Sequence, residues 1–128
     1  MDSKSAKLIK VSLSLQTVEA YDGGARIHRF DCVSGDGDHP TDKGMFVIMR
    51  KYEIYTSHAY HVPMNYAMFF TDDGKALHQY HGPAFEFVRA MKTSVSDWFG
   101  SHGCVRLQEA DARTLFDWAP VGTHVYVF

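Results

Sequence analysis

Apolar and polar residues alternate along the first part of the chain. Every second position over residues 9–15 is apolar, which predicts a β-strand with one buried face. The two glycines within residues 21–25 supply the positive φ angles that a tight hairpin turn needs. We therefore expect a hairpin over residues 17–33. The apolar members of the first strand are Ile9, Val11, Leu13 and Leu15.

Short apolar runs between turn residues predict the remaining strands. Residues 34–44 are the most loop-like stretch, rich in Gly, Asp and Pro. Residues 45–49, which follow, are continuously apolar, as is typical of a buried strand. More strands are expected where aromatic and β-branched residues gather, at 52–62, 64–71, 75–79 and 123–128.

Two amphipathic helices are predicted in the C-terminal half. The first begins near Pro83, ends before Gly100 and has an apolar face of Ala84, Phe87, Val88 and Met91. The second spans residues 108–119, with a face of Ala112, Leu115, Phe116 and Ala119. Strands thus dominate and helices come late, which predicts a mainly β or α+β domain rather than a doubly wound α/β fold.

Composition narrows the class of protein. The 128 residues, 45% of them apolar, suffice for one core, so we expect a single domain over residues 1–128. The net charge of −2 and the lack of a basic cluster argue against a nucleic-acid partner. The longest apolar run, residues 45–49, is far shorter than the roughly 20 residues that span a bilayer, so we expect no membrane span. Residues 1–5 show no secretory signal.

The segment 101–106, with the sequence SHGCVR, carries the strongest chemical signal. Cys104 has a histidine two residues before it and an arginine two residues after it. Such a polar, positive neighbourhood lowers a thiol pKa and favours the thiolate, so Cys104 is the predicted nucleophile. Gly103 allows a sharp turn that lets successive N–H groups converge on a developing oxyanion. We interpret Cys32, at the end of a predicted strand, as structural.

A nucleophilic cysteine also needs a base. His78 and His81 stand out among the eight histidines, because they end a predicted strand just before the first helix. Strand alternation puts the two on opposite faces, so only one can face the thiol while the chain stays extended. We interpret His28, His39 and His124 as surface residues.

Metal chemistry is an alternative for the same residues. The pairs His78-x-x-His81 and His102-x-Cys104 would supply a tetrahedral zinc ion. Against zinc, a ligating Cys104 leaves no role for Arg106, and structural zinc sites more often use C-x-x-C pairs. The acidic loop 34–44 lacks the twelfth-position Glu and the flanking helices of an EF-hand, so we expect a solvated turn there and no calcium site.

The segment around Cys104 resembles the signature of a known family. Residues 101–107 resemble the S/T-H-G-C-hydrophobic-R signature of the L,D-transpeptidase catalytic domain (the YkuD-like family). The other matching segments are 9–21 with the family's opening strand, 33–35 and 41–46 with its S-T-G and T-P-x-G-x-F motifs, 64–70 with its M-P-Y strand, and 111–127 with its closing helix and strand. The resemblance implies a mainly β, sandwich-like fold with two short helices in the C-terminal half.

The resemblance also implies a two-step acyl transfer on peptidoglycan. Cys104 attacks the amide between the L-centred diamino acid and the terminal D-residue of a stem tetrapeptide, releases that D-residue and forms a thioester. An amine of a second stem then takes the acyl group. The implied partners are peptidoglycan stem peptides, with carbapenem-type β-lactams as inhibitors and with no metal or organic cofactor.

Further roles come from the family's motif positions. His102 is expected to shape the site around the thiolate, and Arg106 to lie near the substrate's carboxylate, which a guanidinium fork suits. Ser101, Met64 and Tyr66 are expected to contact substrate.

The base is assigned by the same resemblance. His78 ends the strand that follows the M-P-Y segment, so it is the predicted base, with the carbonyl of Gln79 or a neighbour orienting its other ring nitrogen. His81 is the alternative base, because His81-Gly82 matches the family's H-G dipeptide.

Three departures from the family pattern bear on the site. The segment between the strand histidine and Ser101 is longer than usual, and residues 83–100 are expected to insert a helix into the lid. Gln79 stands where the family usually has Gly, and Thr41-Asp42 stands where it has Thr-Pro. Substrate preference is expected to differ accordingly.

Several functions remain open from the sequence. A hydrolytic L,D-carboxypeptidase would act on the same bond with water as acceptor, and an exported antibacterial effector could carry that activity. A peptidoglycan-binding module without turnover is a further alternative. The substrate implies the periplasm or the cell wall, with no export signal visible in residues 1–5.

Overall fold

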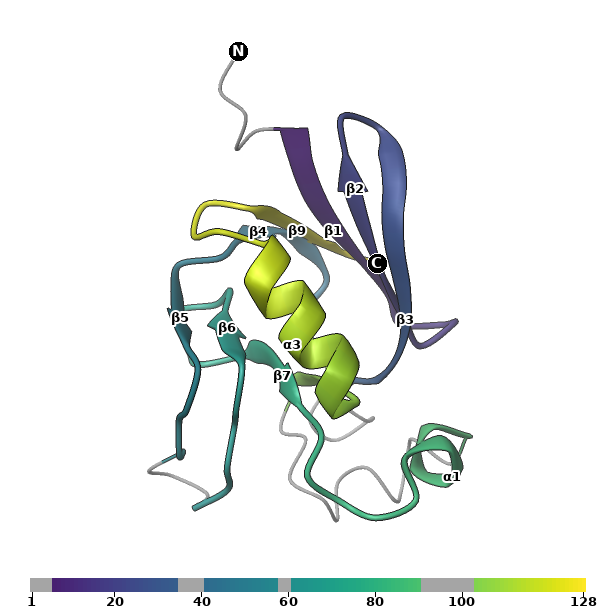
Figure 1. Cartoon of the computed structure of the whole chain (residues 1–128), viewed down its shortest axis with the longest axis vertical. Helices are drawn as coiled ribbons and strands as arrows, with labels where there is room; N and C mark the ends of the chain where they lie inside the picture. Colours follow the sequence, from purple (N-terminus) through teal and green to yellow (C-terminus); the bar gives the residue numbers. More distant parts are fainter. Residues whose placement is uncertain (1–5, 35–40, 58–60, 91–102) are drawn as a thin grey trace.

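A curled nine-stranded sheet is the main feature of the computed structural model, which describes residues 6–34, 41–57, 61–90 and 103–128 (Figure 1). The strands lie in the order β4-β9-β1-β2-β3-β8-β7-β6-β5. Their bounds are Lys7–Ser12 (β1), Thr17–Asp22 (β2), Ala25–Val33 (β3), Gly44–Val47 (β4), Arg50–Tyr52 (β5), Ala67–Phe69 (β6), Ala76–Gln79 (β7), Val105–Leu107 (β8) and His124–Val127 (β9). The described helices are α1 (Phe85–Ala90) and α3 (Glu109–Trp118).

The mainly β prediction with helices in the C-terminal half is therefore confirmed. Most neighbouring strands run antiparallel, but β1 pairs with β9 and β7 with β8 in parallel. Both parallel pairs join strands far apart in the sequence, because parallel neighbours need a long crossover connection.

The alternating pattern at the N-terminus forms β1, although the strand is shorter than predicted. Ile9 and Val11 are fully buried, as the period-2 pattern requires. Leu15, predicted on the same face, is 63% exposed, because the chain leaves the strand after Ser12 and turns through Gln16 at φ +56°. The predicted hairpin over 17–33 is confirmed as β2 and β3, with Gly23 and Gly24 at positive φ in the turn.

The strand predicted over residues 45–49 is confirmed as β4, but it is shorter than predicted and only partly buried. Met45 and Val47 are exposed, because they point to one face of β4 while Phe46, on the opposite face, packs against the core. In the described sheet β4 is an edge strand that pairs only with β9. Ile48, just after β4, is buried in the core, and the N–H of Met49 donates to the carbonyl of Phe69 at 2.8 Å. The chain thus passes from one edge of the sheet to the other, which curls the sheet.

The two predicted central strands are also shorter than expected. The stretch 52–62 keeps only Tyr52 in a strand, and the stretch 64–71 keeps only Ala67–Phe69. Tyr66 has a positive φ of 55°, which breaks the extended conformation before β6. Aromatic content overestimated strand length here because it reports burial as much as extension.

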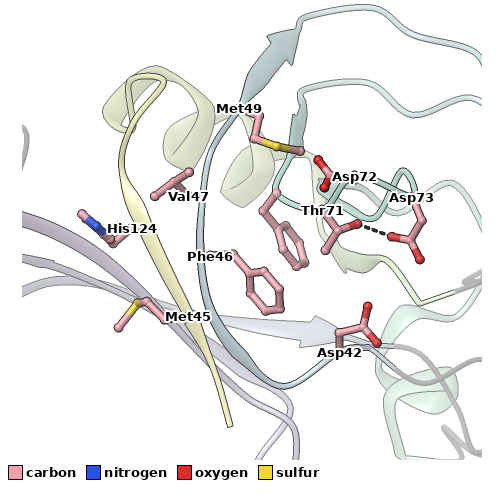
Figure 2. A pocket seen from close by; sticks show the side chains of 10 residues that line it. Asp42, Met45, Phe46, Val47, Met49, Thr71, Asp72, Asp73 and His124 are labelled. Carbon is pink, nitrogen blue, oxygen red and sulfur yellow. Dashed lines mark hydrogen bonds between the residues drawn. The ribbon is translucent and has the colours of Figure 1, made fainter.

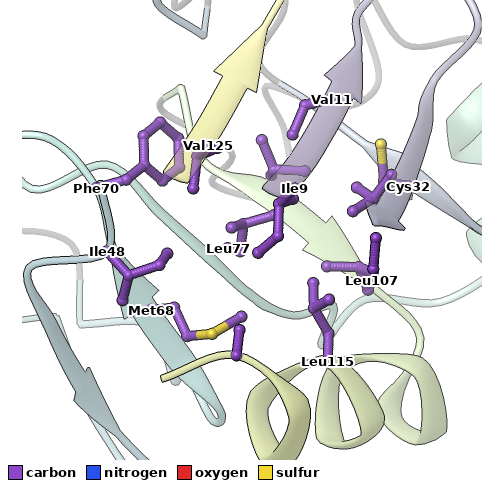
Figure 3. Packing of buried hydrophobic residues seen from close by; sticks show 14 of the residues in the cluster. Ile9, Val11, Cys32, Ile48, Met68, Phe70, Leu77, Leu107, Leu115 and Val125 are labelled. Atoms are coloured by element: carbon purple, nitrogen blue, oxygen red, sulfur yellow. The ribbon is translucent and has the colours of Figure 1, made fainter. Parts of the chain in front are cut away.

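Helix α3 covers one face of the sheet and closes the core, as predicted. Ala112 and Leu115 are buried against sheet residues, and Ala119 caps the helix through an N–H bond to the carbonyl of Leu115. Figure 3 shows Leu115 pointing from this helix toward Leu77 and Leu107. Cys32 lies in the same core and is fully buried, which agrees with a structural role.

Helix α1 differs from its prediction. It spans six residues in the described part of the chain, and Val88 is its buried residue, whereas Phe87 is 61% exposed. Met91 and the rest of the predicted helix to residue 100 lie outside the described residues. Arg89 fixes α1 to the sheet through Asp31 at 3.1 Å and the carbonyl of Gln16 at 3.1 Å. None of the described helices is both long and apolar enough to cross a membrane.

Candidate active site

The parallel pair of β7 and β8 positions the candidate nucleophile. Its register places Leu77 opposite Val105 and His78 opposite Arg106. Leu77 and Val105 belong to the main core, and side chains alternate along a strand. Cys104, immediately before β8, therefore lies on the other face of the sheet, together with His78 and Arg106.

Cys104 lies in a small apolar cluster on that face. Its side chain is 7% exposed and packs with Met64, Ala67, Phe69 and Ala76. The N–H of Ala76 donates to Sγ of Cys104 at 3.4 Å, and the carbonyl oxygen of Gly74 lies 4.0 Å from the same sulfur. A backbone donor aimed at the sulfur stabilises negative charge there, so strand β7 supports the thiolate without a side chain.

The residue before the cysteine shows why a glycine stands there. Gly103 has φ +89°, a left-handed conformation that costs a side-chain-bearing residue energy. Thr41 holds this turn in place, because its buried hydroxyl donates to the carbonyl of Gly103 at 2.8 Å. Sequence reasoning missed this contact, although Thr41 opens the segment that matched the family's T-P-x-G-x-F motif.

The expected lowering of the thiol pKa is not what the described site shows. Burial raises the pKa of Cys104 to about 11, although the N–H of Ala76 and the charges of Arg106 and Lys75 act in the opposite direction. The sequence shows which charges are near the thiol but not how completely the apolar cluster removes water from it. The resting group is therefore a thiol, which needs a base to take its proton.

His78, the predicted base, is a buried and neutral imidazole. It is 5% exposed, and burial, aided by the charge of Arg106, lowers its pKa to about 3, so the imidazole is neutral at pH 7. Its Nδ1 lies 2.8 Å from the carbonyl oxygen of Gln79, the contact expected from the sequence. Since a carbonyl only accepts, Nδ1 carries the ring proton and Nε2 keeps a free lone pair. The backbone thus orients the ring with Nε2 as the acceptor nitrogen, although a pKa this low makes the resting imidazole a weak base.

The alternative base lies in a different setting. His81 is exposed and follows the end of β7, whereas His78 is inside the strand beside β8. The register places His78 on the Cys104 face of the pair, whereas His81 lies beyond the paired residues of β7. On the same face His78 and Cys104 are diagonal neighbours, with Cα atoms about 8 Å apart by the spacing of a sheet.

The residues predicted to contact substrate lie in different parts of the structure. Arg106 is 2% exposed, with its guanidinium over the ring of Tyr80 at 5.1 Å. Met64 is in the Cys104 cluster, but Tyr66 packs against Phe116 of α3, with ring centroids 5.7 Å apart, and so belongs to the main core. His102 and Ser101 lie outside the described residues.

The metal alternatives gain no support. Within residues 6–34, 41–57, 61–90 and 103–128, no group of three or more His, Cys, Asp or Glu side chains could hold a metal ion. His102, one of the four ligands in the zinc interpretation, lies outside this part of the chain.

An open pocket of about 650 Å³ lies beside the turn that contacts Cys104 (Figure 2). Carboxylates of Asp42, Asp72 and Asp73 line one side, and residues of and next to β4 line the other. Lys75 bridges Asp42 at 3.0 Å and Asp73 at 2.8 Å, and its hydrogen bond lowers the pKa of Asp73. Sequence reasoning missed this ion-pair cluster, although the Asp-for-Pro departure at position 42 signalled it.

Comparison with known proteins places this geometry in a family. The sequence model of the YkuD family, described as the L,D-transpeptidase catalytic domain, matches residues 6–127. The chain belongs to this family. The resemblance inferred from residues 101–107 is therefore confirmed. A search of curated proteins finds no match.

Solved structures of L,D-transpeptidases share the fold. One, from Stackebrandtia nassauensis, is 28% identical with a TM-score of 0.81 and is matched over 100% of this chain and 58% of its own. A mutant of the Enterococcus faecium L,D-transpeptidase, with cysteine replaced by serine, is 27% identical, with a TM-score of 0.79 and coverage of 97% and 50%. A third, LdtMt1 in complex with imipenem, is 22% identical, with a TM-score of 0.83 and coverage of 96% and 59%, and shows the fold alone.

The chain therefore spans between half and three fifths of the length of these solved structures.

Proposed function

We propose that the chain is a cysteine-dependent peptidoglycan L,D-transpeptidase. The observation that carries the proposal is the placement of Cys104 and His78 on one face of adjacent strands, with the N–H of Ala76 on the sulfur and the carbonyl of Gln79 on the imidazole. Membership of the L,D-transpeptidase family supports the reaction class, and the proposed substrate is a stem tetrapeptide that ends in a D-residue.

The first half of the reaction forms a thioester. Nε2 of neutral His78 takes the thiol proton as Sγ of Cys104 adds to the carbonyl carbon of the amide that follows the diamino acid. The oxyanion is stabilised by backbone N–H groups at the Gly103 turn, which Thr41 fixes through the carbonyl of Gly103. The amide C–N bond then breaks, and His78 returns the proton to the amine of the departing D-residue.

The second half releases the enzyme. An amine of another stem attacks the thioester carbon and gives its proton to His78, and the new amide forms as the C–S bond breaks. The sulfur leaves as thiolate and recovers the proton from His78. The raised pKa of Cys104 makes this proton return favourable, because the thiol is the stable resting form.

Other parts of the proposal follow from the substrate. Met64 and Arg106 are the proposed substrate contacts among the described residues, since both lie on the Cys104 face. The proposed location is the periplasm or the cell wall, where peptidoglycan lies. Carbapenem-type β-lactams are proposed to acylate Cys104, in keeping with the imipenem complex of LdtMt1.

The test is mass spectrometry of purified muropeptides after incubation with the protein. We expect loss of the terminal D-residue and formation of cross-linked dimers with the parent and with Cys32→Ala, and neither product with Cys104→Ala. Circular dichroism of both variants shows that they are folded. Activity that survives in Cys104→Ala but is lost in folded Cys32→Ala overturns the assignment, whereas trimmed monomers without dimers favour the L,D-carboxypeptidase alternative.

A further inference from the structure

Two segments that are far apart in the sequence hold the thiol and its turn. One begins at Thr41, whose hydroxyl donates to the carbonyl of Gly103 at 2.8 Å. The other is the turn between β6 and β7, residues 70–75, after which the N–H of Ala76 donates to Sγ of Cys104 at 3.4 Å. The position of the nucleophile therefore depends on how these two segments lie relative to each other.

The β6–β7 turn is closed by hydrogen bonds of its own. The N–H of Phe70 donates to the carbonyl of Lys75 at 3.0 Å, and the N–H of Lys75 donates to the hydroxyl of Thr71 at 2.9 Å. The same hydroxyl donates to the carboxylate of Asp73 (Figure 2). All these contacts lie within the turn, so they fix its shape and not its position relative to the segment that begins at Thr41.

An ion pair joins the two segments. Nζ of Lys75 lies 3.0 Å from the carboxylate of Asp42 and 2.8 Å from that of Asp73. Asp42 follows Thr41 in the sequence, and Lys75 precedes Ala76. Each partner of the Asp42–Lys75 pair is thus one residue away from a group that contacts the thiol or its turn. Lys75 is 16% exposed and Asp42 is 51% exposed, so solvent screens the pair only in part.

A ring contact supports the same junction. Phe46, in the segment that begins at Thr41, packs against Phe70 of the β6–β7 turn, with ring centroids 5.5 Å apart. Phe70 is buried in the main core, and Phe46 packs against that core. The fold is therefore expected to survive the loss of the ion pair, which then affects only how closely the two segments are held together.

We propose that Asp42 and Lys75 are positioning residues for the nucleophile, and that their ion pair fixes the β6–β7 turn against the segment that begins at Thr41. The pair thereby keeps the N–H of Ala76 on the sulfur and the Gly103 turn in the orientation that acyl transfer needs. The inference rests on the proposed function, because it assigns a task within that reaction. It also gives a role to the aspartate at position 42, which stands where the family motif has proline.

Charge and position make opposite predictions for one substitution. Arg106 and Lys75 lower the pKa of Cys104, whereas the carboxylate of Asp73 raises it. A negative charge near a thiol disfavours the thiolate, so removal of the Asp42 charge should by electrostatics alone leave acylation unchanged or make it faster. Loss of the ion pair should instead make acylation slower. Asp42→Asn therefore separates the two effects, whereas Lys75→Met does not.

The test follows the acylation of Cys104 by imipenem, measured by mass spectrometry over time. We expect Asp42→Asn to react about two- to fivefold more slowly than the parent, because a partly exposed ion pair transmits no more than its own modest free energy. Lys75→Arg keeps a cation between the two carboxylates and should react faster than Lys75→Met. Glu19→Gln, which breaks the 2.9 Å pair with Arg26 in the β2–β3 hairpin, is the matched control and should react like the parent.

Hydrogen exchange measured by NMR reports the same contact without any reaction. The backbone amide of Ala76 should exchange faster in Asp42→Asn than in the parent, because a turn that is less firmly held opens more often. The reference is the amide of Cys32, which donates to the carbonyl of Gln16 at 3.0 Å. An ion pair with a merely structural role would change both amides together and would leave acylation of the folded protein unchanged.

The outcomes separate this inference from the proposed function. Acylation of Asp42→Asn at or above the parent rate overturns the inference, even if the parent cross-links muropeptides. So does exchange at Ala76 that is unchanged relative to Cys32. Slower acylation together with faster exchange at Ala76 supports it. If imipenem does not acylate even the parent, this counts against the proposed function, and the exchange rates alone decide whether the ion pair positions the thiol.

Discussion

Acidification should destabilise this protein through the buried side chain of His78. His78 is 5% exposed, and burial lowers its pKa to about 3. In the unfolded chain the same group titrates near 6.5. Between these two pH values the unfolded state binds a proton that the folded state does not, so stability is fully present above about pH 6.5 and is lost as the pH falls.

The magnitude follows from the two pKa values. Each pH unit below 6.5 costs about 1.4 kcal/mol in the free energy of unfolding, down to the folded pKa. At pH 5 the loss is about 2 kcal/mol, and it depends little on the folded value as long as that value stays well below 5. Removing the imidazole, as in His78→Gln, removes this contribution.

Urea unfolding of the parent and of His78→Gln at pH 7 and pH 5 measures the effect. We expect the parent to lose about 2 kcal/mol more than the variant between the two pH values. His124→Gln controls for the loss of an imidazole elsewhere in the sheet. If the parent and His78→Gln lose the same amount, the low pKa of His78 in the folded protein is refuted.

Three further predictions follow from the same structure. His78→Ala should slow the acylation of Cys104 by a carbapenem by about 10²- to 10⁴-fold, as measured by mass spectrometry over time. His81→Ala should stay within a few-fold of the parent rate. The reverse order of the two rates would move the base to His81. Dialysis against a chelator should leave muropeptide turnover intact and treatment with an oxidant should abolish it, whereas zinc that restores a dead apo-protein would favour the metal alternative. Leu115→Ala should lower the free energy of unfolding by about 2–5 kcal/mol, because Leu115 is fully buried. Leu15→Ala, at a 63% exposed position, should change it by less than about 0.5 kcal/mol. The midpoints of urea unfolding measure both changes.

Part of the site could be predicted from the sequence, because it depends on residues close together in the chain. The SHGCVR segment predicted Cys104 as the nucleophile, and strand alternation predicted that His78 and His81 face opposite ways, because a period of two is a property of any extended chain. The Gln79 carbonyl contact with His78 follows from the same local geometry. Helix α3 was predictable because its apolar spacing and its stop at Pro120 lie within one short segment.

Tertiary structure decided what depends on neighbours distant in the sequence. The apolar run 45–49 became a half-exposed edge strand, because side-chain burial depends on which face of the strand the rest of the fold covers. Burial raises the pKa of Cys104 instead of lowering it as expected, because Met64, Phe69 and Ala76, from other parts of the chain, pack around its side chain. Residue types along a chain show which charges are available, but desolvation depends on how completely the folded chain excludes water, and only the assembled sheet fixes that.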